Sequence, residues 1–219
     1  MEALQKSRRG EINILAIPSL AAGAIASAVG EFSISHPGIN ARFGISMSRQ
    51  ISERVAQNRS DVGFVHGSSG YPGVRESFVT ETHIHCLMKT GHPLTARQEI
   101  TALDLSPYPL ISFDVESPPS VQIREAFSKA GLQANVRTEI NASLLAAEAV
   151  RGKTVAFVDP LSVKPDPGLV MRPFNPRIPL SIFILTHQDK TPSLPVAAFC
   201  DTARHLIFRA VMKLQENQS

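Results

Sequence analysis

Small polar residues follow several apolar, strand-like runs of this sequence, just before a helix is expected to begin. A helix start offers unpaired backbone N–H groups and the positive end of the helix dipole, which can hold a carboxylate without Lys or Arg. Ser and Asn are also ordinary N-cap residues, so capping is the alternative at each position. Their recurrence in both halves of the chain favours a two-sided anion-binding site. The residues are Ser19, Ser46 and Ser48 in the first half and Asn141 and Ser143 in the second.

Two further side chains could add a charge or a proton to such a site. Asp159 ends an apolar run and precedes Pro160. Its carboxylate could accept hydrogen bonds from an ammonium or guanidinium group of a ligand. It could equally start a loop as an Asx turn, and the sequence leaves both open. His66 stands before the Gly-Ser-Ser-Gly loop at residues 67–70 and could contact a ligand, although a single histidine is a weak signal.

The common motifs of phosphate binding, metalloprotease and serine-hydrolase chemistry are absent. The sequence has no Gly-x-Gly-x-x-Gly, no phosphate loop ending in Gly-Lys-Ser/Thr, no His-Glu-x-x-His and no Gly-x-Ser-x-Gly. His83 and His85 stand two apart on an expected strand and share a face, but two ligands are too few for a convincing metal site. We therefore predict no catalytic residue, no metal and no cofactor, and expect a binding module rather than an enzyme.

Composition narrows the class of protein further. With 219 residues, of which 43% are hydrophobic and 19% charged, the chain can bury a sizeable core. The net charge is +3, and the one dense basic run, Lys-Ser-Arg-Arg at residues 6–9, is better interpreted as a solvated tail or linker than as a nucleic-acid surface. Cys86 and Cys200 lie in apolar runs, which predicts buried thiols. No export signal and no apolar run of about 18 residues is present, which predicts a cytoplasmic protein without a membrane segment.

The apolar pattern predicts strands that alternate with helices. Gly131 is expected to end one helix as its left-handed cap. Such alternation implies parallel sheets covered on both faces, with ligands outside the carboxyl ends of the strands. Strands are expected at residues 12–17, 39–45, 61–66, 83–88, 109–113, 136–140, 154–158 and 180–185. Helices are expected around residues 25–32, 51–55, 123–127 and 144–152, with a terminal helix whose apolar residues are Val196, Phe199, Ala203, Leu206, Ala210 and Leu214.

Several short runs, in order and at fitting spacing, resemble the effector-binding domain of LysR-type transcriptional regulators. The likeness extends from about Gly10 to the terminal helix. One departure is Asn58-Arg59, which replaces a glycine often seen before the strand at residues 61–66 and could alter that turn. The runs are residues 10–20, Phe32 with His-Pro-Gly at 36–38, Asp-Val-Gly-Phe-Val at 61–65, Gly-His-Pro-Leu at 91–94 and Leu-Ile-Ser-Phe at 110–113.

The resemblance implies an α/β fold of two Rossmann-like lobes joined by two crossing strands, like a type 2 periplasmic binding protein. The crossings map to residues 80–84 and 184–187. Lobe I would be residues 10–82 plus 187–219, and lobe II residues 83–186. Residues 1–9 would be the end of a linker helix, with the family's winged helix-turn-helix absent from this chain. The implied ligand-binding residues are Ser19, Leu20, Met47, Ser48, His66, Gly67, Asn141, Ser143 and Asp159.

The resemblance also implies a function, namely sensing of a small effector in the cleft between the lobes to control DNA binding and transcription. Val158-Asp159-Pro160 resembles the branch that senses amino acids and opines. On this hypothesis the serines and helix starts hold the effector's carboxylate, and Asp159 holds its cationic end. The family implies a homodimer through this domain, a tetramer of the full-length protein, and DNA contact only through the missing N-terminal domain. A solute-binding protein of a transporter and, less favoured, an enzyme on the same two-lobed fold are the alternatives.

Overall fold

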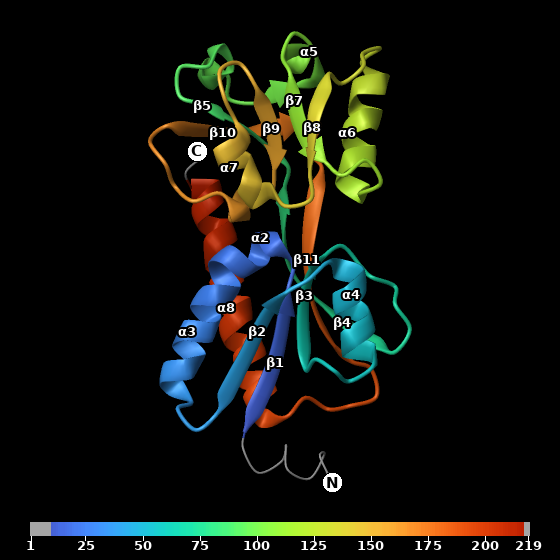
Figure 1. The fold of residues 1–219 in the computed structure, drawn as a ribbon, viewed down its shortest axis with the longest axis vertical. Coiled ribbons are helices and arrows are strands. Elements are labelled where there is room, and N and C mark those ends of the chain that lie inside the picture. Colours follow the sequence, from blue (N-terminus) through green and yellow to red (C-terminus); the bar gives the residue numbers. More distant parts are fainter. Residues whose placement is uncertain (1–9, 217–219) are drawn as a thin grey trace. The chain divides into compact units, whose positions relative to one another are not determined.

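The computed structural model describes residues 10–216 and divides the chain into two compact units (Figure 1). One unit extends to Glu81 and resumes at Ser181, and the other is Thr82–Leu180. The expected linker-helix end and the basic run, both at residues 1–9, lie outside the described residues. Between residues 10 and 216, no helix is long and apolar enough to cross a membrane.

A five-stranded sheet forms the centre of the first unit, in the order β2-β1-β3-β11-β4. Strand β1 pairs in parallel with β2 and β3, as the alternating pattern predicts, but β11 runs antiparallel to β3. The sheet is therefore mixed, and the prediction of purely parallel sheets is wrong for this strand. The bounds are β1 Glu11–Ala16, β2 Asn40–Ile45, β3 Val62–His66, β4 Val74–His83 and β11 Pro179–His187.

Helices cover both faces of this sheet. Figure 1 shows α3 and α8 on one side and α4 on the other. Phe199 of α8 packs edge-on against Phe32 of α3 and Phe64 of β3, which fixes the position of the terminal helix. The bounds are α2 Pro18–Leu20, a π-helical turn Ala21–Ile25, α3 Ala26–Ser35, α4 Ser48–Ala56 and α8 Leu194–Glu216.

The terminal helix buries a different stripe from the one expected in its second half. Val196, Phe199 and Ala203 are buried as predicted, but the stripe continues through Ile207 and Val211. Leu206, Ala210 and Leu214 are not in that buried row. The buried row follows the i+4 ridge of the helix, because that ridge meets the neighbouring elements, and spacing alone does not decide between i+3 and i+4.

The second unit is built on a six-stranded sheet in the order β6-β10-β5-β9-β7-β8. The neighbours β9, β7 and β8 are parallel, whereas β5 is antiparallel to both β9 and β10, so this sheet is also mixed. The run expected as one strand over residues 83–88 is interrupted at Ile84, where β4 ends and β5 begins. The bounds are β5 His85–Lys89, β6 Ile100–Thr101, β7 Leu110–Phe113, β8 Val136–Ile140, β9 Val155–Val158 and β10 Leu169–Asn175.

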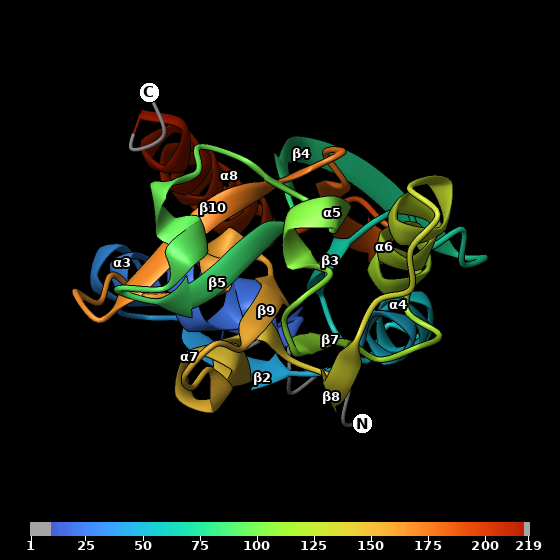
Figure 2. The ribbon, with the colours of Figure 1, turned by 90° about the horizontal axis from the view of Figure 1, so that it is seen from above.

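Two apolar clusters lie on opposite faces of the second sheet. Figure 2 shows α6 and α7 on either side of β7 and β9. Phe127 of α6 joins the larger cluster, and Ala146 of α7 joins the smaller one. The helix expected to reach residue 152 is short and ends at Ala149. The bounds are α5 Ala102–Leu105, α6 Pro118–Lys129, α7 Ala146–Ala149, and three 3₁₀ turns at Pro93–Ala96, Ser143–Leu145 and Pro160–Ser162.

Two turns follow from the residues that form them. Gly131 has φ +71° and closes α6, since its N–H donates to Ser128 O at 2.9 Å and the N–H of Leu132 donates to Phe127 O at 2.9 Å. Asn58 has φ +54° before β3. Asn tolerates the left-handed region better than most residues, so the turn forms without the glycine that the family often has there.

The chain passes between the units within two strands. The first passage is at Glu81/Thr82 in β4, and the second is at Leu180/Ser181 in β11. The sequence places the second passage between residues 186 and 187, six residues later in the same strand. The two crossing strands of the expected fold are thus β4 and β11.

Candidate functional site

The carboxyl ends of β1, β2 and β3 lie at one edge of the first sheet, which brings three expected site segments together. The N–H of Ile17 donates to Phe64 O at 3.1 Å, and the N–H of Ser46 donates to Ala16 O at 3.1 Å. These bonds continue the strand pairing past the strand ends. The residues that follow each strand therefore start from fixed positions side by side, as expected for parallel strands.

Ser19 and His66, which are 47 residues apart in the sequence, form a polar pair at this edge. Ser19 Oγ lies 3.3 Å from His66 Nε2, and Ser19 is only 8% exposed. The N-cap positions of α2 and α4 are Ile17 and Met47, and no side chain caps either helix. The capping alternative is therefore wrong for Ser19 and Ser48, and the hydroxyl of Ser19 faces the imidazole instead.

The start of α4 leaves its first backbone amides without a side-chain partner. This nine-residue helix begins at Ser48 without a side-chain cap, so its first-turn amides present the positive end of the helix dipole. Ser48 is half-buried, and Met47 beside it is 47% exposed. Ser46, by contrast, donates to Gln50 Oε1 at 2.7 Å. The backbone amides and the Ser48 hydroxyl at this helix start are hydrogen-bond donors, as is the hydroxyl of Ser19.

Leu20 and Gly67 follow Ser19 and His66 directly in the chain and have no polar side chain. Leu20 is buried in the core of the first unit, and the N–H of Gly67 already donates to Ser181 O at 2.8 Å. Gly67 has φ +71°, so it turns the chain sharply after His66. Both residues fix where Ser19 and His66 stand.

Glu76 anchors the loop that follows His66, a contact for which the sequence holds no local signal. Its carboxylate accepts hydrogen bonds from Ser68 Oγ at 2.6 Å, Ser69 Oγ at 2.6 Å, Ser69 N at 2.8 Å and Gly70 N at 3.0 Å. Burial by itself would raise the pKa of the Glu76 carboxyl, but these hydrogen bonds outweigh it and lower the pKa. The loop is thereby tied to β4.

In the second unit, two of the three expected site residues are bonded to each other. The N–H of Asp159 donates to Ser143 Oγ at 3.1 Å, and both residues are buried. Asp159 Oδ1 accepts from the N–H of Leu161 at 2.9 Å, which caps the turn at Pro160. The Asx-turn alternative is thus realised, with the residue only 2% exposed. Asn141 is exposed just after the end of β8.

The histidines at residues 83 and 85, expected to share a face of one strand, are divided between two strands. His83 and His85 stand on different strands, and His85 Nδ1 lies 2.9 Å from His83 O. Within residues 10–216, no group of three or more His, Cys, Asp or Glu side chains is arranged to hold a metal ion.

Comparison with known proteins identifies the family. Residues 5–207 match the model of the LysR substrate binding domain. The regulatory protein NocR of Agrobacterium tumefaciens (strain T37) is 26% identical over 200 residues, which are 90% of this chain and 66% of NocR. The transcriptional activator protein LysR of Escherichia coli (strain K12) is 21% identical over 90% of this chain and 65% of its own length. The chain thus spans about two thirds of these relatives.

Solved structures agree on the fold. The cofactor-binding domain of the Cbl transcriptional regulator superposes with a TM-score of 0.78 at 18% identity and covers 93% of both chains. The effector-binding domain of BenM, solved with its effector benzoate, has a TM-score of 0.74 at 17% identity and covers 91% of this chain and 93% of that one. The architecture is the two-unit α/β fold of periplasmic binding proteins, and this chain belongs to the LysR substrate-binding domain family.

Proposed function

We propose that this chain is the effector-sensing part of a LysR-type transcriptional regulator, and that its first unit holds the carboxylate of a small amino-acid-like or opine effector. One observation carries the proposal. At the edge where three parallel strands end, α4 starts without a side-chain cap, and the part-buried Ser19–His66 pair lies at the same edge. Uncapped helix starts are ready-made anion sites.

Each part of the edge has a defined role in this proposal. The amides at the start of α4 donate to the carboxylate, and the Ser48 hydroxyl adds a donor from the same turn. Ser19 donates to the ligand while His66 accepts or donates according to its tautomer. Met47, half exposed beside them, covers the apolar part of the effector. A site of this kind selects for shape and for the carboxylate group together.

Asp159 is proposed to hold the cationic end of the effector. Support is chemical: a buried carboxylate can form a strong charge-assisted hydrogen bond with an ammonium or guanidinium group. Ser143, whose Oγ accepts from the N–H of Asp159, and Asn141 are proposed as further contacts of the effector.

Regulation follows from binding only if the effector has different affinities for two states of the protein. We propose a cytoplasmic regulator that forms a homodimer through this domain, a tetramer when full-length, and contacts DNA only through a separate N-terminal domain. The relatives NocR and LysR are regulators, which favours this function over a transporter's solute-binding protein or an enzyme.

Thermal melting against amino acids, opines and small organic acids tests the proposal. A ligand at 100 times its Kd stabilises the native state by about 2.7 kcal/mol, which raises Tm by roughly 5–11 °C for a chain of this size. Ser19→Ala should weaken binding about tenfold to a hundredfold, because it removes a hydrogen bond to a charged group. Ser33→Ala, on the exposed face of α3, is the matched control.

The outcomes separate the parts of the proposal. Protection by an arginine- or lysine-derived compound that Asp159→Asn abolishes supports both the sensor and the role of Asp159. Protection only by plain organic acids keeps the carboxylate site and removes that role. If no compound protects, or if Ser19→Ala binds as well as the Ser33→Ala control, the proposed carboxylate site is wrong.

A further inference from the structure

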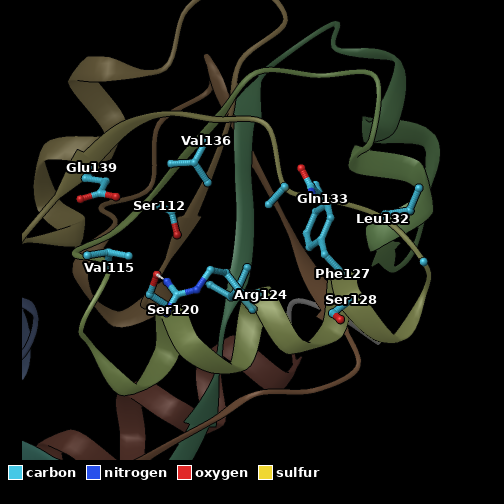
Figure 3. Close-up of a pocket in the computed structure, with 13 residues that line it drawn as sticks. Ser112, Val115, Ser120, Arg124, Phe127, Ser128, Leu132, Gln133, Val136 and Glu139 are labelled. Atoms are coloured by element: carbon cyan, nitrogen blue, oxygen red, sulfur yellow. Dashed lines mark hydrogen bonds between the residues drawn. The ribbon is translucent and has the colours of Figure 1, made fainter.

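A cavity of about 670 Å³ lies wholly within the second unit, between α6 and the strands β7 and β8 (Figure 3). None of the nine residues expected to bind the effector lines it. Its volume falls in the range of small-molecule sites, roughly 300–1,000 Å³. The residues that decide its chemistry are Ser112, Ser120, Arg124, Phe127, Val136 and Glu139.

One wall of the cavity carries hydrogen-bonding groups that no core packing requires. Ser112, in β7, is only 2% exposed, and its side chain lines the cavity in Figure 3. That hydroxyl makes no hydrogen bond with any other described residue. Ser112 Oγ is not among the buried side-chain atoms that lack a partner, so the atom is open to the cavity and a ligand atom can bond to it.

A cation stands beside this hydroxyl. Arg124 Nη1 donates to Ser120 Oγ at 2.9 Å, and Figure 3 shows the guanidinium lying along the cavity. Arg124 forms no ion pair with a carboxylate among the described residues. Its remaining N–H groups are therefore available, and guanidinium groups bind carboxylates in a fork geometry.

The rest of the cavity is apolar and fixed in position. Phe127 and Ile123 of α6 are buried in the larger cluster of the second unit, and Leu132 and Val136 pack against that cluster. The left-handed cap at Gly131 holds the end of α6. The cavity thus combines a cationic end with an apolar floor.

We propose that this cavity binds a small monocarboxylate with a compact apolar or aromatic body. The carboxylate bonds to Arg124 and the hydroxyls of Ser112 and Ser120, and the apolar body lies on Phe127 and Val136. Glu139, which also lines the cavity, disfavours a second carboxylate. This site is separate from the effector site proposed above and shares no residue with it, so either can stand without the other.

Isothermal titration with hydrocinnamate as the probe tests the proposal on the whole chain. We expect saturable binding to one site, with hydrocinnamyl alcohol at least about tenfold weaker because it lacks the charge that Arg124 recognises. Arg124→Gln should weaken the binding of hydrocinnamate by about tenfold or more. Lys129→Gln removes the same charge from the same helix outside the cavity and should bind like the wild type.

Two further variants test whether hydrocinnamate binds in this cavity and not elsewhere on the chain. Ser128→Phe places a ring at an exposed position that lines the opening, and should block binding without disturbing the core. Ser19→Ala, which disables the proposed effector site, should leave hydrocinnamate binding unchanged. Circular dichroism melting checks that each variant folds.

Three titration results would overturn the proposal. They are the absence of saturable binding at millimolar hydrocinnamate, equal affinity in Arg124→Gln and Lys129→Gln, and loss of binding in Ser19→Ala. If Arg124→Gln or Ser128→Phe changes the association state of the chain in sedimentation while hydrocinnamate gives no heat, the cavity is a subunit contact and the proposal fails. Failure of the first unit's effector site would leave these titrations unaffected.

Discussion

Gly63 controls how closely α4 can approach the first sheet, and Gly63→Ala should be strongly destabilising. A Cβ at this position would lie well inside contact distance of Ile51 Cγ2, and within 3.4 Å of Val55 Cγ2 and 3.5 Å of Leu185 Cβ. Carbon atoms pack at about 3.5–4.0 Å. Ile51 and Val55 are fully buried, so neither can turn into solvent, and α4 must move away from β3 by about an ångström.

The expected cost follows from the size of this overlap. Overpacking a tight core by one methyl group costs about 1–3 kcal/mol, which lowers Tm by roughly 2–12 °C for a chain of this length. Differential scanning calorimetry measures the change. Because Met47 and Ser48 stand at the start of α4, the variant should also weaken binding of the effector if the proposed site is correct.

Two control variants test whether this steric overlap is the cause of the destabilisation. At Gly30, in the exposed part of α3, an added Cβ meets nothing within 4 Å. Gly30→Ala should therefore stabilise the chain by about 0.5–1 kcal/mol, the opposite sign. Ile51→Leu removes the branched methyl that collides, so it should recover part of the loss in the Gly63→Ala background. A Tm for Gly63→Ala equal to the wild type, or no rescue by Ile51→Leu, refutes the reasoning.

Three other predictions concern hydrogen bonds and ionisable groups. Glu76→Gln should loosen the loop after β3, and faster amide exchange in that loop would show this. Because folding lowers the pKa of Glu76, its carboxylate stabilises the native state above the ordinary pKa of 4.5, and this stabilisation is lost as the pH falls. The variant should therefore lack this part of the acid-induced loss of stability. Ser143→Ala should lower the free energy of unfolding in urea by about 1–3 kcal/mol, because it leaves the buried N–H of Asp159 without its acceptor. A decrease smaller than the error of the fit would contradict this. Burial raises the pKa of the Cys86 thiol, and burial with the charge of Asp201 raises that of Cys200 to about 11. Iodoacetamide at pH 8 should therefore label both thiols slowly in the native state, and Cys86 more slowly than Cys200. The free energy of unfolding should fall as pH rises from about 9 to 11, because the Cys200 thiol loses its proton more readily in the unfolded chain. Equal labelling rates for native and unfolded protein would refute the prediction that these thiols are protected.

The sequence alone determined most of the strands and the class of fold. Buried parallel strands read as continuous apolar runs, so β1, β3, β7 and β9 are predicted closely. Gly131 is correctly predicted as a helix cap, because few other residues accept its backbone conformation. The order of the short family runs added the two-unit architecture, which no single run specifies.

Strands that are only half-buried escape the sequence pattern. β10 and most of β4 show neither a continuous apolar run nor a clean alternation, since their neighbours rather than a core cover them. The sequence pattern also fails to predict that β11 and β5 run antiparallel to their neighbours. The chain crosses between the units in β4 and β11, and strand direction is fixed by that crossing rather than by local composition.

At the candidate sites, the sequence supplied the residue types and the tertiary structure decided their partners. Ser19 has the character of a helix cap, but folding places it against His66, and Asp159 meets Ser143 across 16 residues. Arg124 and Ser112 carry no signal in the sequence, because they stand on different elements that only folding brings to one cavity. Periodicity reports which side of an element is buried, whereas a binding site depends on distances between elements, and these are set by packing of the whole core.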